Sequence, residues 1–261
     1  SQSSWIDICH DLPFSALAAS QPGANLNDLA FVDMYGSLRG QRYPVHPRVV
    51  NPRLPKGVIL QMFVRSFPAP MFATNCWIVA IAQGSECIIV DPGMPDISKE
   101  IEMIIEEHRL KPVAALLTHG HLDHTFSIVP LADGYDIPTY IHSEDRRFIA
   151  NPLGLHGPEF AQQIGAITFT EPKHVSELKN GAVIDLVGMK VTAIHAPGHT
   201  RGSMMFTVND EILISGDVLF AGSIGRTDLP TGSASDMTHT LKTRVLTLSD
   251  ELRVLTGHGP E

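Results

Sequence analysis

The sequence contains no apolar run long enough to cross a membrane, and its amino end has no basic region followed by an apolar segment. A membrane-spanning helix needs about 20 consecutive apolar residues, and a secretory signal needs a shorter apolar segment behind a basic one. We therefore expect no transmembrane helix, no secretory signal and no membrane partner.

Cysteine and positive charge are also scarce. Cys9, Cys76 and Cys87 form no even set for a disulfide framework, which is typical of a reducing compartment, so we expect a cytoplasmic protein. With 19 Lys and Arg against 28 Asp and Glu, the formal net charge is −9, and no run rich in Lys or Arg occurs. Nucleic acids bind to basic surfaces, so no nucleic-acid partner is expected.

Regular patterning is weak at the amino end of the chain. Residues 1–56 include four prolines between positions 44 and 55, which interrupt any long helix or strand. We interpret this stretch as an irregular extension in front of a main domain that covers residues 57–261. Over the whole chain, hydrophobic residues make up 43% and charged residues 18%, which is typical of a globular protein.

Beyond residue 57, short apolar runs alternate with segments of helical spacing. Ile97, Ile101 and Ile105 lie on one face of a helix predicted over residues 97–108. Further helices are predicted over residues 126–132, 143–148 with Ser143 as its cap, 159–164 and 238–248. Strands are predicted over residues 58–64, 76–81, 87–90, 113–117, 139–141, 183–186, 190–194, 204–208, 212–214 and 252–255. Because the strands come in hairpin-like clusters, the pattern favours a layered α/β sandwich over a doubly wound parallel sheet.

The most informative stretch is Thr118-His119-Gly120-His121-Leu122-Asp123-His124, directly after the predicted strand 113–117. In an extended segment, residues two positions apart project to the same side, so His119 and His121 can address one point. Asp123 and His124 come where the chain turns into a helix and can address a second point nearby. Neutral imidazoles and carboxylates are ligands that zinc accepts, and four of them at a strand end bring no packing benefit. The stretch therefore predicts a metal site.

Three more candidate ligands occur in the same context, each after an apolar strand and directly behind a glycine. They are His199, Asp217 and His258. One zinc ion needs three protein ligands and an open position, whereas seven candidates suit two ions that share a carboxylate. A single ion would leave three or four buried polar groups in need of other partners, which costs free energy but is an open alternative.

Four segments carry a resemblance to a known family. They are Thr-His-Gly-His-Leu-Asp-His, Ala-Pro-Gly-His-Thr-Arg-Gly-Ser, Ser-Gly-Asp-Val-Leu-Phe and Thr-Gly-His-Gly-Pro, in this order along the chain. Together they resemble the motif set of the metallo-β-lactamase superfamily, which implies an αββα four-layer sandwich with the metals at one edge of the two sheets. The resemblance implies that His119, His121 and His199 hold the first metal, that Asp123, His124 and His258 hold the second, and that Asp217 bridges them.

Within the superfamily, the stretch Gly225-Arg226-Thr227-Asp228-Leu229-Pro230 resembles the glyoxalase II-like branch. True β-lactamases of the superfamily lack an aspartate corresponding to Asp217, which weakens that interpretation. Glyoxalase II itself carries a helical domain with glutathione-binding residues, whereas this sequence resembles the small bacterial glyoxalase-like proteins without it. The resemblance therefore implies thioester hydrolysis more directly than specificity for glutathione.

The expected enzyme is thus a binuclear metal hydrolase of small acyl thioesters, of the hydroxyacylglutathione hydrolase type. Its cofactors are expected to be two divalent ions, zinc first and iron or manganese as alternatives. Such ions lower the pKa of a bridging water and supply hydroxide at neutral pH, and Asp123 is the candidate catalytic residue that orients it. A small thioester is the expected partner, and the sequence does not indicate an oligomeric state.

Other functions are compatible with the same motifs. A persulfide dioxygenase of this fold would use one iron on His119 or His121, on His199 and on Asp217. A lactonase or esterase would use the two-metal site on another substrate, and a non-enzymatic scaffold is disfavoured because all seven ligand positions are filled. Arg226 can either bind a substrate carboxylate or pair with Asp228.

The last residues of the sequence raise a separate expectation. His258 lies close to Glu261, the last residue. If this end of the chain frays, the second metal should bind more weakly than the first.

Overall fold

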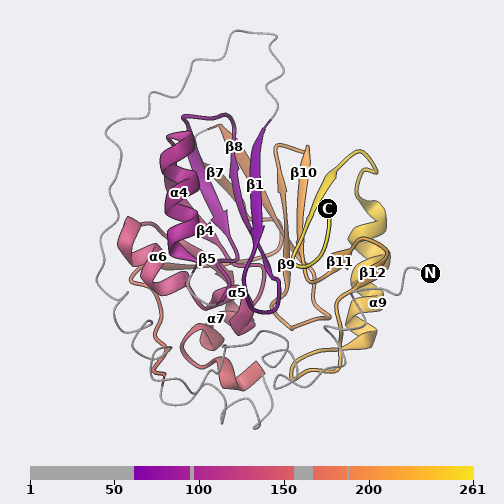
Figure 1. The fold of residues 1–261 in the computed structure, drawn as a ribbon. Coiled ribbons are helices and arrows are strands. Elements are labelled where there is room, and N and C mark those ends of the chain that lie inside the picture. The colour runs from indigo at the N-terminus through magenta and orange to yellow at the C-terminus, as the bar shows by residue number, and fades with distance from the viewer. Residues whose placement is uncertain (1–61, 95–96, 156–166, 187) are drawn as a thin grey trace, which may run out of the picture.

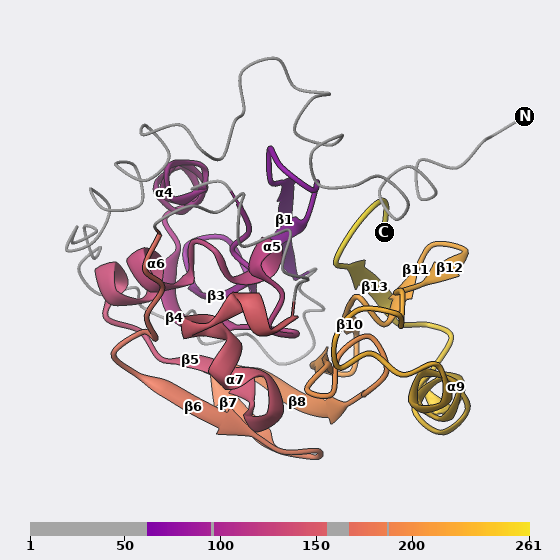
Figure 2. The same ribbon diagram turned by 90° about the horizontal axis from the view of Figure 1, so that it is seen from below.

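The structure is a computed structural model that describes residues 62–94, 97–155, 167–186 and 188–261. Two β-sheets lie face to face, with helices against their outer faces (Figure 1). Figure 2 shows α4 (Ser98–His108) and α6 (Ile128–Tyr135) outside the first sheet and α9 (Ala234–Thr243) on the side of the second. The predicted αββα sandwich is confirmed, whereas the predicted extension 1–56 lies outside the described residues.

The first sheet has six strands whose spatial order follows the sequence. They are β1 (Phe63–Pro68), β2 (Asn75–Ala80), β3 (Glu86–Val90), β4 (Lys111–Leu116), β5 (Thr139–His142) and β6 (Val175–Leu178). The pairs from β1 to β3 are antiparallel, and those from β3 to β6 are parallel. The parallel strands end at the same edge, and this edge carries the loop after β4.

The second sheet has five strands in the order β13, β10, β9, β8, β7. They are β7 (Val183–Leu186), β8 (Met189–His195), β9 (Met204–Val208), β10 (Ile212–Gly216) and β13 (Arg253–Thr256). Neighbouring strands are antiparallel except for β10 and β13, which are parallel. A small hairpin of β11 (Leu219–Phe220) and β12 (Ser223–Ile224) follows β10.

The remaining helical elements are short. They are α5 (Leu122–Thr125), α7 (Ser143–Ala150) and the 3-10 helices η1 (Pro152–Leu155) and η2 (Val245–Thr247). Along the described parts of the chain, no helix combines the length and the apolar character that a membrane crossing requires.

Apolar side chains pack on both sides of each sheet. Between the sheets, Ile88 and Leu116 of the first sheet pack with Phe206 of the second, and all three are fully buried. Outside the first sheet, Ile101 and Ile105 of α4 join another cluster, which confirms the buried face predicted for this helix. Full burial of each such side chain contributes about 2 kcal/mol to folding. This rigid body of strands positions the loops at its edge.

Two helices differ at their amino ends from what the sequence predicts. The side chain of Ser233 accepts a hydrogen bond from Asp236 N at 3.2 Å and caps α9, which therefore begins before residue 238. α7 is capped by His142, whose ring accepts a hydrogen bond from Glu144 N at 3.3 Å. The prediction that Ser143 caps this helix is wrong by one residue, because an imidazole nitrogen takes the role of the hydroxyl.

Strand β6 was not predicted. Its sequence, Val175-Ser176-Glu177-Leu178, has only two apolar residues, and Ser176 and Glu177 are exposed at the edge of the sheet. The predicted helical turn at residues 159–164 and the first residues of the predicted strand 58–64 lie outside the described residues.

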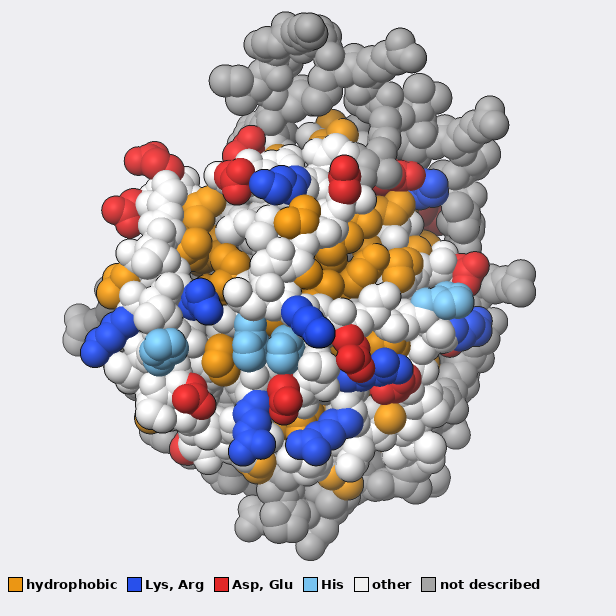
Figure 3. Space-filling model, turned by 180° about the vertical axis from the view of Figure 1, so that it is seen from behind, with side chains coloured by type: hydrophobic (Ala, Val, Ile, Leu, Met, Phe, Trp, Pro, Cys, Tyr) orange, Lys and Arg blue, Asp and Glu red, His pale blue; other side chains and the backbone are white. Residues whose placement is uncertain are grey.

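Charges are mixed on the face of the molecule opposite to that of Figure 1. Among the coloured side chains of Figure 3, basic and acidic groups are interspersed. Among the ion pairs of the described residues, Arg146 contacts Glu171 at 2.8 Å and Glu177 at 3.1 Å.

Candidate metal centre

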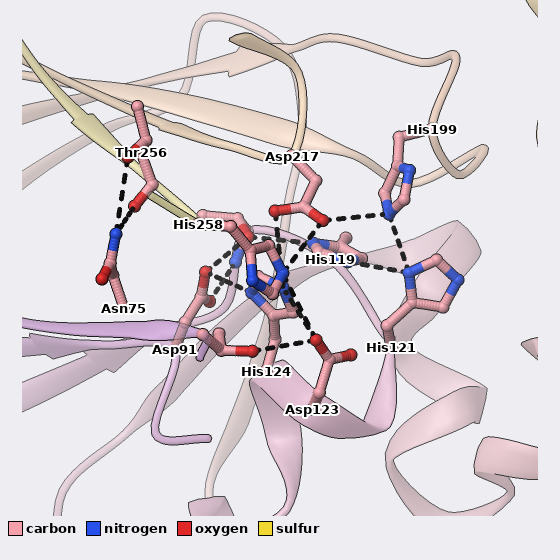
Figure 4. A network of polar contacts seen from close by, with 12 residues as sticks. Asn75, Asp91, His119, His121, Asp123, His124, His199, Asp217, Thr256 and His258 are labelled. Atoms are coloured by element: carbon pink, nitrogen blue, oxygen red, sulfur yellow. Dashed lines mark hydrogen bonds and ion pairs between the residues drawn. The ribbon is translucent and has the colours of Figure 1, made fainter. Parts of the chain in front are cut away.

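All seven predicted metal ligands lie at one edge of the sandwich, in loops that follow four strands (Figure 4). They are His119, His121, Asp123 and His124 after β4, His199 after β8, Asp217 after β10 and His258 after β13. The sheets hold these strand ends side by side, so residues that are far apart in the sequence meet at this edge. The structure brings the seven side chains together, and their role as ligands stays a prediction.

Glycines let these loops approach one another. Gly216 has a φ of 50°, and a Cβ at this position would lie 2.6 Å from Thr118 Oγ1. A Cβ on Gly257 would overlap Asp217 Oδ1. The glycines in front of Asp217 and His258 therefore allow the close approach of these loops.

Three imidazoles form one group of nitrogen atoms, here called the first donor set (His119, His121 and His199). His121 Nδ1 lies 2.9 Å from His119 Nε2 and 2.8 Å from His199 Nε2. All three residues are buried. A hydrogen on His121 Nδ1 can serve only one of the two facing nitrogens, so the lone pair of the other is left without a donor among these three rings.

The second donor set (Asp123, His124 and His258) lies beside the first. His124 Nε2 and His258 Nε2 are 3.3 Å apart. Asp123 Oδ2 is 3.5 Å from His124 Nε2 and 3.4 Å from His258 Nε2. Two imidazoles and a carboxylate oxygen thus face one another, which is a donor combination that divalent transition metals accept.

Asp217 lies between the two donor sets (Figure 4). Its Oδ2 is 3.4 Å from His199 Nε2 of the first set and 3.5 Å from His258 Nε2 of the second. Its Oδ1 is 3.4 Å from His124 Nε2 and, although buried, forms no hydrogen bond with the described residues. A buried carboxylate oxygen without a donor needs another positive partner, and a metal ion would be one.

The outer nitrogens of the imidazoles show which tautomers are present. His199 Nδ1 lies 2.8 Å from the carbonyl oxygen of Arg226, and His258 Nδ1 lies 3.0 Å from that of Phe72. A carbonyl oxygen only accepts, so both Nδ1 atoms carry a hydrogen. In the neutral ring, Nε2 of each histidine is then a lone pair directed at the centre.

The same reasoning applies to two further histidines. His124 Nδ1 donates to Asp91 Oδ2 at 2.9 Å. Thr118 Oγ1 donates to the same carboxylate at 2.6 Å, so it accepts from His119 Nδ1 at 3.0 Å. Four of the five histidines of the centre therefore direct an unprotonated nitrogen inward when neutral. Facing lone pairs repel unless a cation lies between them, so the residues present fit two metal ions.

The pKa values of His119 and His199 in the first donor set and those of His124 and His258 in the second shift in opposite directions. Burial is the main cause that lowers the pKa of His119 and of His199. Burial also acts against protonation of His258, but the facing carboxylates outweigh it and raise the pKa of His258 to about 10. The same opposition raises the pKa of His124. Without a metal, His119 and His199 are thus deprotonated at neutral pH, while His124 and His258 retain protons.

Asp91 is a functional residue that the sequence analysis missed. It follows β3 at the same edge, is buried, and its Oδ1 accepts from Thr118 N at 2.8 Å. Together with its contacts to Thr118 Oγ1 and His124, this carboxylate fixes two histidine tautomers at once. The available signal is an aspartate directly after an apolar strand, which is the same sequence context as that of the ligands.

His258 is fastened on both sides. The side-chain amide of Asn75 donates to Thr256 O at 3.1 Å and to Gly259 O at 2.8 Å. Asn75 N donates to Gly257 O at 2.7 Å, and Arg253 pairs with Glu261 through two contacts of 2.6 Å. The position of His258 near Glu261 therefore does not by itself predict a weaker second metal site.

Of the two roles predicted for Arg226, binding a substrate carboxylate or pairing with Asp228, the structure shows the pair with Asp228. Its Nε donates to Asp228 Oδ1 at 2.7 Å, and its second guanidinium nitrogen contacts Asp228 Oδ2 at 2.6 Å. This bidentate pair braces the loop whose carbonyl oxygen at Arg226 fixes the tautomer of His199.

A family model described as the metallo-beta-lactamase superfamily matches residues 69–258, which include all seven candidate ligands. The chain belongs to the metallo-beta-lactamase superfamily. The resemblance read from the sequence motifs is thereby confirmed at the level of the superfamily, and every strand of the two sheets except β1 falls within the match.

Three individual proteins are similar to this chain over most of their length. Hydroxyacylglutathione hydrolase GloC of Haemophilus influenzae is 31% identical over 202 residues, which cover 76% of this chain and 91% of that protein. The B3 metallo-beta-lactamase BLEG-1 is 30% identical, with a TM-score of 0.67 over 76% of this chain and 92% of that one. TTHA1623, solved in a di-iron-bound form, is 29% identical, with a TM-score of 0.54 over 83% of this chain and 93% of that one.

Proposed function

We propose that the chain is a binuclear metal-dependent hydrolase of small acyl thioesters, of the hydroxyacylglutathione hydrolase type. One observation carries this proposal: two complete donor sets meet at the shared carboxylate of Asp217. The second donor set has no role in a site for a single iron, so its completeness favours a hydrolase over a persulfide dioxygenase. The similarity to GloC supports the thioester as substrate.

Two divalent ions in the donor sets would supply Lewis-acid polarisation and hydroxide at neutral pH. Asp123 is the proposed catalytic residue. Its Oδ2 faces His124 and His258 and accepts a hydrogen bond from Thr74 Oγ1 at 2.9 Å, whereas its Oδ1 makes none of these contacts. The carboxylate can therefore hold its place through Oδ2 and orient the attacking nucleophile through Oδ1.

A thioester suits a site of this composition. The thiolate released on cleavage belongs to a thiol with a pKa of about 8.5, so it leaves without a strong general acid. The seven side chains of the centre are imidazoles and carboxylates directed at the metals, and thioester cleavage asks for no further acid among them. Cys76 and Cys87 are buried free thiols, which supports the proposed cytoplasmic location.

The experiment combines metal analysis with a substrate panel. The full chain is stripped of metal, reloaded with zinc, iron or manganese, and assayed with S-lactoylglutathione, an acyl thioester without glutathione, a lactone and a β-lactam. We expect two ions per chain and fastest turnover on a thioester. A β-lactam is included in the panel because of the similarity to BLEG-1. Faster turnover on the β-lactam than on any thioester would show that the proposed substrate class is wrong. One iron per chain with oxygen uptake on glutathione persulfide would overturn the hydrolase.

A further inference from the structure

A buried carboxylate outside the ligand motifs joins two of the metal-binding loops. Asp145 lies on α7, and its side chain is fully buried, with 0% exposed. Its Oδ2 accepts from Gly120 N at 2.9 Å and from Thr200 Oγ1 at 2.6 Å, and its Oδ1 accepts from Gly202 N at 2.9 Å. One carboxylate thus receives three hydrogen bonds from segments that are far apart in sequence.

These partners are the neighbours of the first donor set. Gly120 stands between His119 and His121, and Thr200 directly follows His199. Asp145 therefore holds the backbone of both segments that supply this donor set. It forms no hydrogen bond with Asp123, His124 or His258, whose outer contacts are those of Asp91, Phe72 and Thr74.

Steric fit shows that the loops are built around this carboxylate. A Cβ on Gly202 would lie 2.5 Å from both Cγ and Oδ1 of Asp145. A Cβ on Gly120 would lie 3.0 Å from the backbone oxygen of Asp145. Glycine at both positions lets the amides come within hydrogen-bond distance, and no larger side chain fits without displacing α7 or the loops.

The chemistry of the three contacts requires an acceptor on both oxygens. Two of the donors are backbone N–H groups, which cannot reverse their role, and an ionised carboxylate offers acceptors only. An amide in place of the carboxylate would direct an NH₂ group at one of these donors while keeping the shape. The fold does not depend on this contact alone, because Met204 N also donates to Thr118 O at 2.8 Å and links the same two segments.

We propose that Asp145 is a positioning residue that sets the spacing of the first donor set, His119 and His121 on one loop and His199 on the other. It touches no ligand side chain and acts through the backbone of both loops. The proposal rests on the proposed function, because it presupposes that the first donor set binds a metal. It implies that loss of the carboxylate weakens one metal site and spares the other.

The test uses Asp145→Asn in the full chain and measures zinc binding to the metal-free protein by calorimetry with a competing chelator. Residues that orient ligands from outside typically change metal affinity by about 10- to 100-fold, so we expect a loss of this size at one site. Glu144→Gln is the matched control, because Glu144 is exposed on the same helix. It should bind both ions as the wild type does.

Two backgrounds assign the loss to a site. In His258→Ala the first donor set remains intact, and adding Asp145→Asn should remove tight binding. In His121→Ala the second donor set remains, and adding Asp145→Asn should change nothing. Equal affinities with and without Asp145→Asn in His258→Ala would overturn the proposal, and so would an equal loss in both backgrounds.

A second substitution keeps the test decisive if Asp145→Asn does not fold. Thr200→Val removes one donor and leaves the carboxylate, so it should weaken the first site in part, and Thr200→Ser should restore it. Wild-type affinity in Thr200→Val would contradict the proposal. A wild type that binds no metal would instead refute the proposed function, so the two failures are distinguishable.

Discussion

The two donor sets of the candidate metal centre differ in charge and therefore in the number of protons that they bind when no metal is present. The first donor set, His119, His121 and His199, consists of imidazoles alone, and burial lowers the pKa of His119 and His199. The second donor set contains Asp123, and the facing carboxylates raise the pKa of His258 to about 10. A metal entering the first set meets free lone pairs, whereas one entering the second must displace protons.

The two sets also differ in what holds them from outside. The first depends on a backbone carbonyl at Arg226, on Thr118 and on the loops that Asp145 joins. The second depends on Thr74 and directly on Asp91, which also supports the first set through Thr118. Substitutions of these supporting residues should therefore change the metal affinities of the two sites to different extents.

The largest effect is expected where the two sets meet. Asp217→Asn keeps the shape of the side chain and removes the charge that both sets share, so both ions should bind more weakly. Loss of metal assistance costs several kcal/mol in the transition state, and we expect activity to fall by about 1,000-fold. Circular dichroism would show that the fold is retained. Near-normal turnover on the preferred substrate would contradict a carboxylate that both ions share.

A smaller effect, stronger on the second ion than on the first, is expected from Asp91→Asn, because Asp91 contacts His124 directly and reaches His119 only through Thr118. The amide can no longer accept from both Thr118 and His124, so the tautomer of His124 becomes less well defined. We expect the second ion to bind about 10- to 100-fold more weakly, as measured by chelator competition. Asp185→Asn, at an exposed position of β7, is the control. A loss of affinity confined to the first ion would contradict the inference that Asp91 supports the second donor set.

Proton release should distinguish the two binding events in the unmodified chain. At pH 8 the raised pKa of His258 keeps it protonated in the metal-free protein, so binding of the second ion should release about one proton or more. His119 and His199 have lowered pKa values and should release none. Affinity of the second site should therefore rise with pH until about pH 10, and that of the first should stay flat.

Calorimetry in buffers of different ionisation enthalpy measures this release directly. The stability of the metal-free chain should follow the same group. Protonation of His258 stabilises the fold below its unfolded pKa of about 6.5, and this contribution is lost as the pH rises through about 10. Equal proton release in both binding events would remove the electrostatic distinction between the donor sets.

The smallest effect is expected from Thr74→Val, which removes one hydrogen bond to Asp123 Oδ2. The carboxylate retains its other contacts, so we expect kcat to fall by about 10-fold with little change in metal content. Thr74→Ser keeps the hydroxyl and should restore kcat. Loss of an ion in Thr74→Val would show that the threonine supports binding rather than orientation.

The sandwich and the gathering of the seven side chains could be predicted because each of them follows an apolar strand. Strands of this kind end at one edge of a layered fold, so His199 and His258 could be placed near His119 without coordinates. Asp145 could not be found in this way, because two of its three partners are backbone amides, which every residue carries. The edge strand β6 escaped for a related reason, since Ser176 and Glu177 are exposed and leave no apolar pattern.

If two complete donor sets share Asp217, the chain binds two metal ions, and the metal content of the chain measures this number. The full chain and His258→Ala are loaded with zinc, freed of excess metal, and measured by mass spectrometry with protein quantified in the same sample. We expect two ions per chain in the wild type and one in His258→Ala. A single ion in the wild type that persists unchanged in His258→Ala would contradict it.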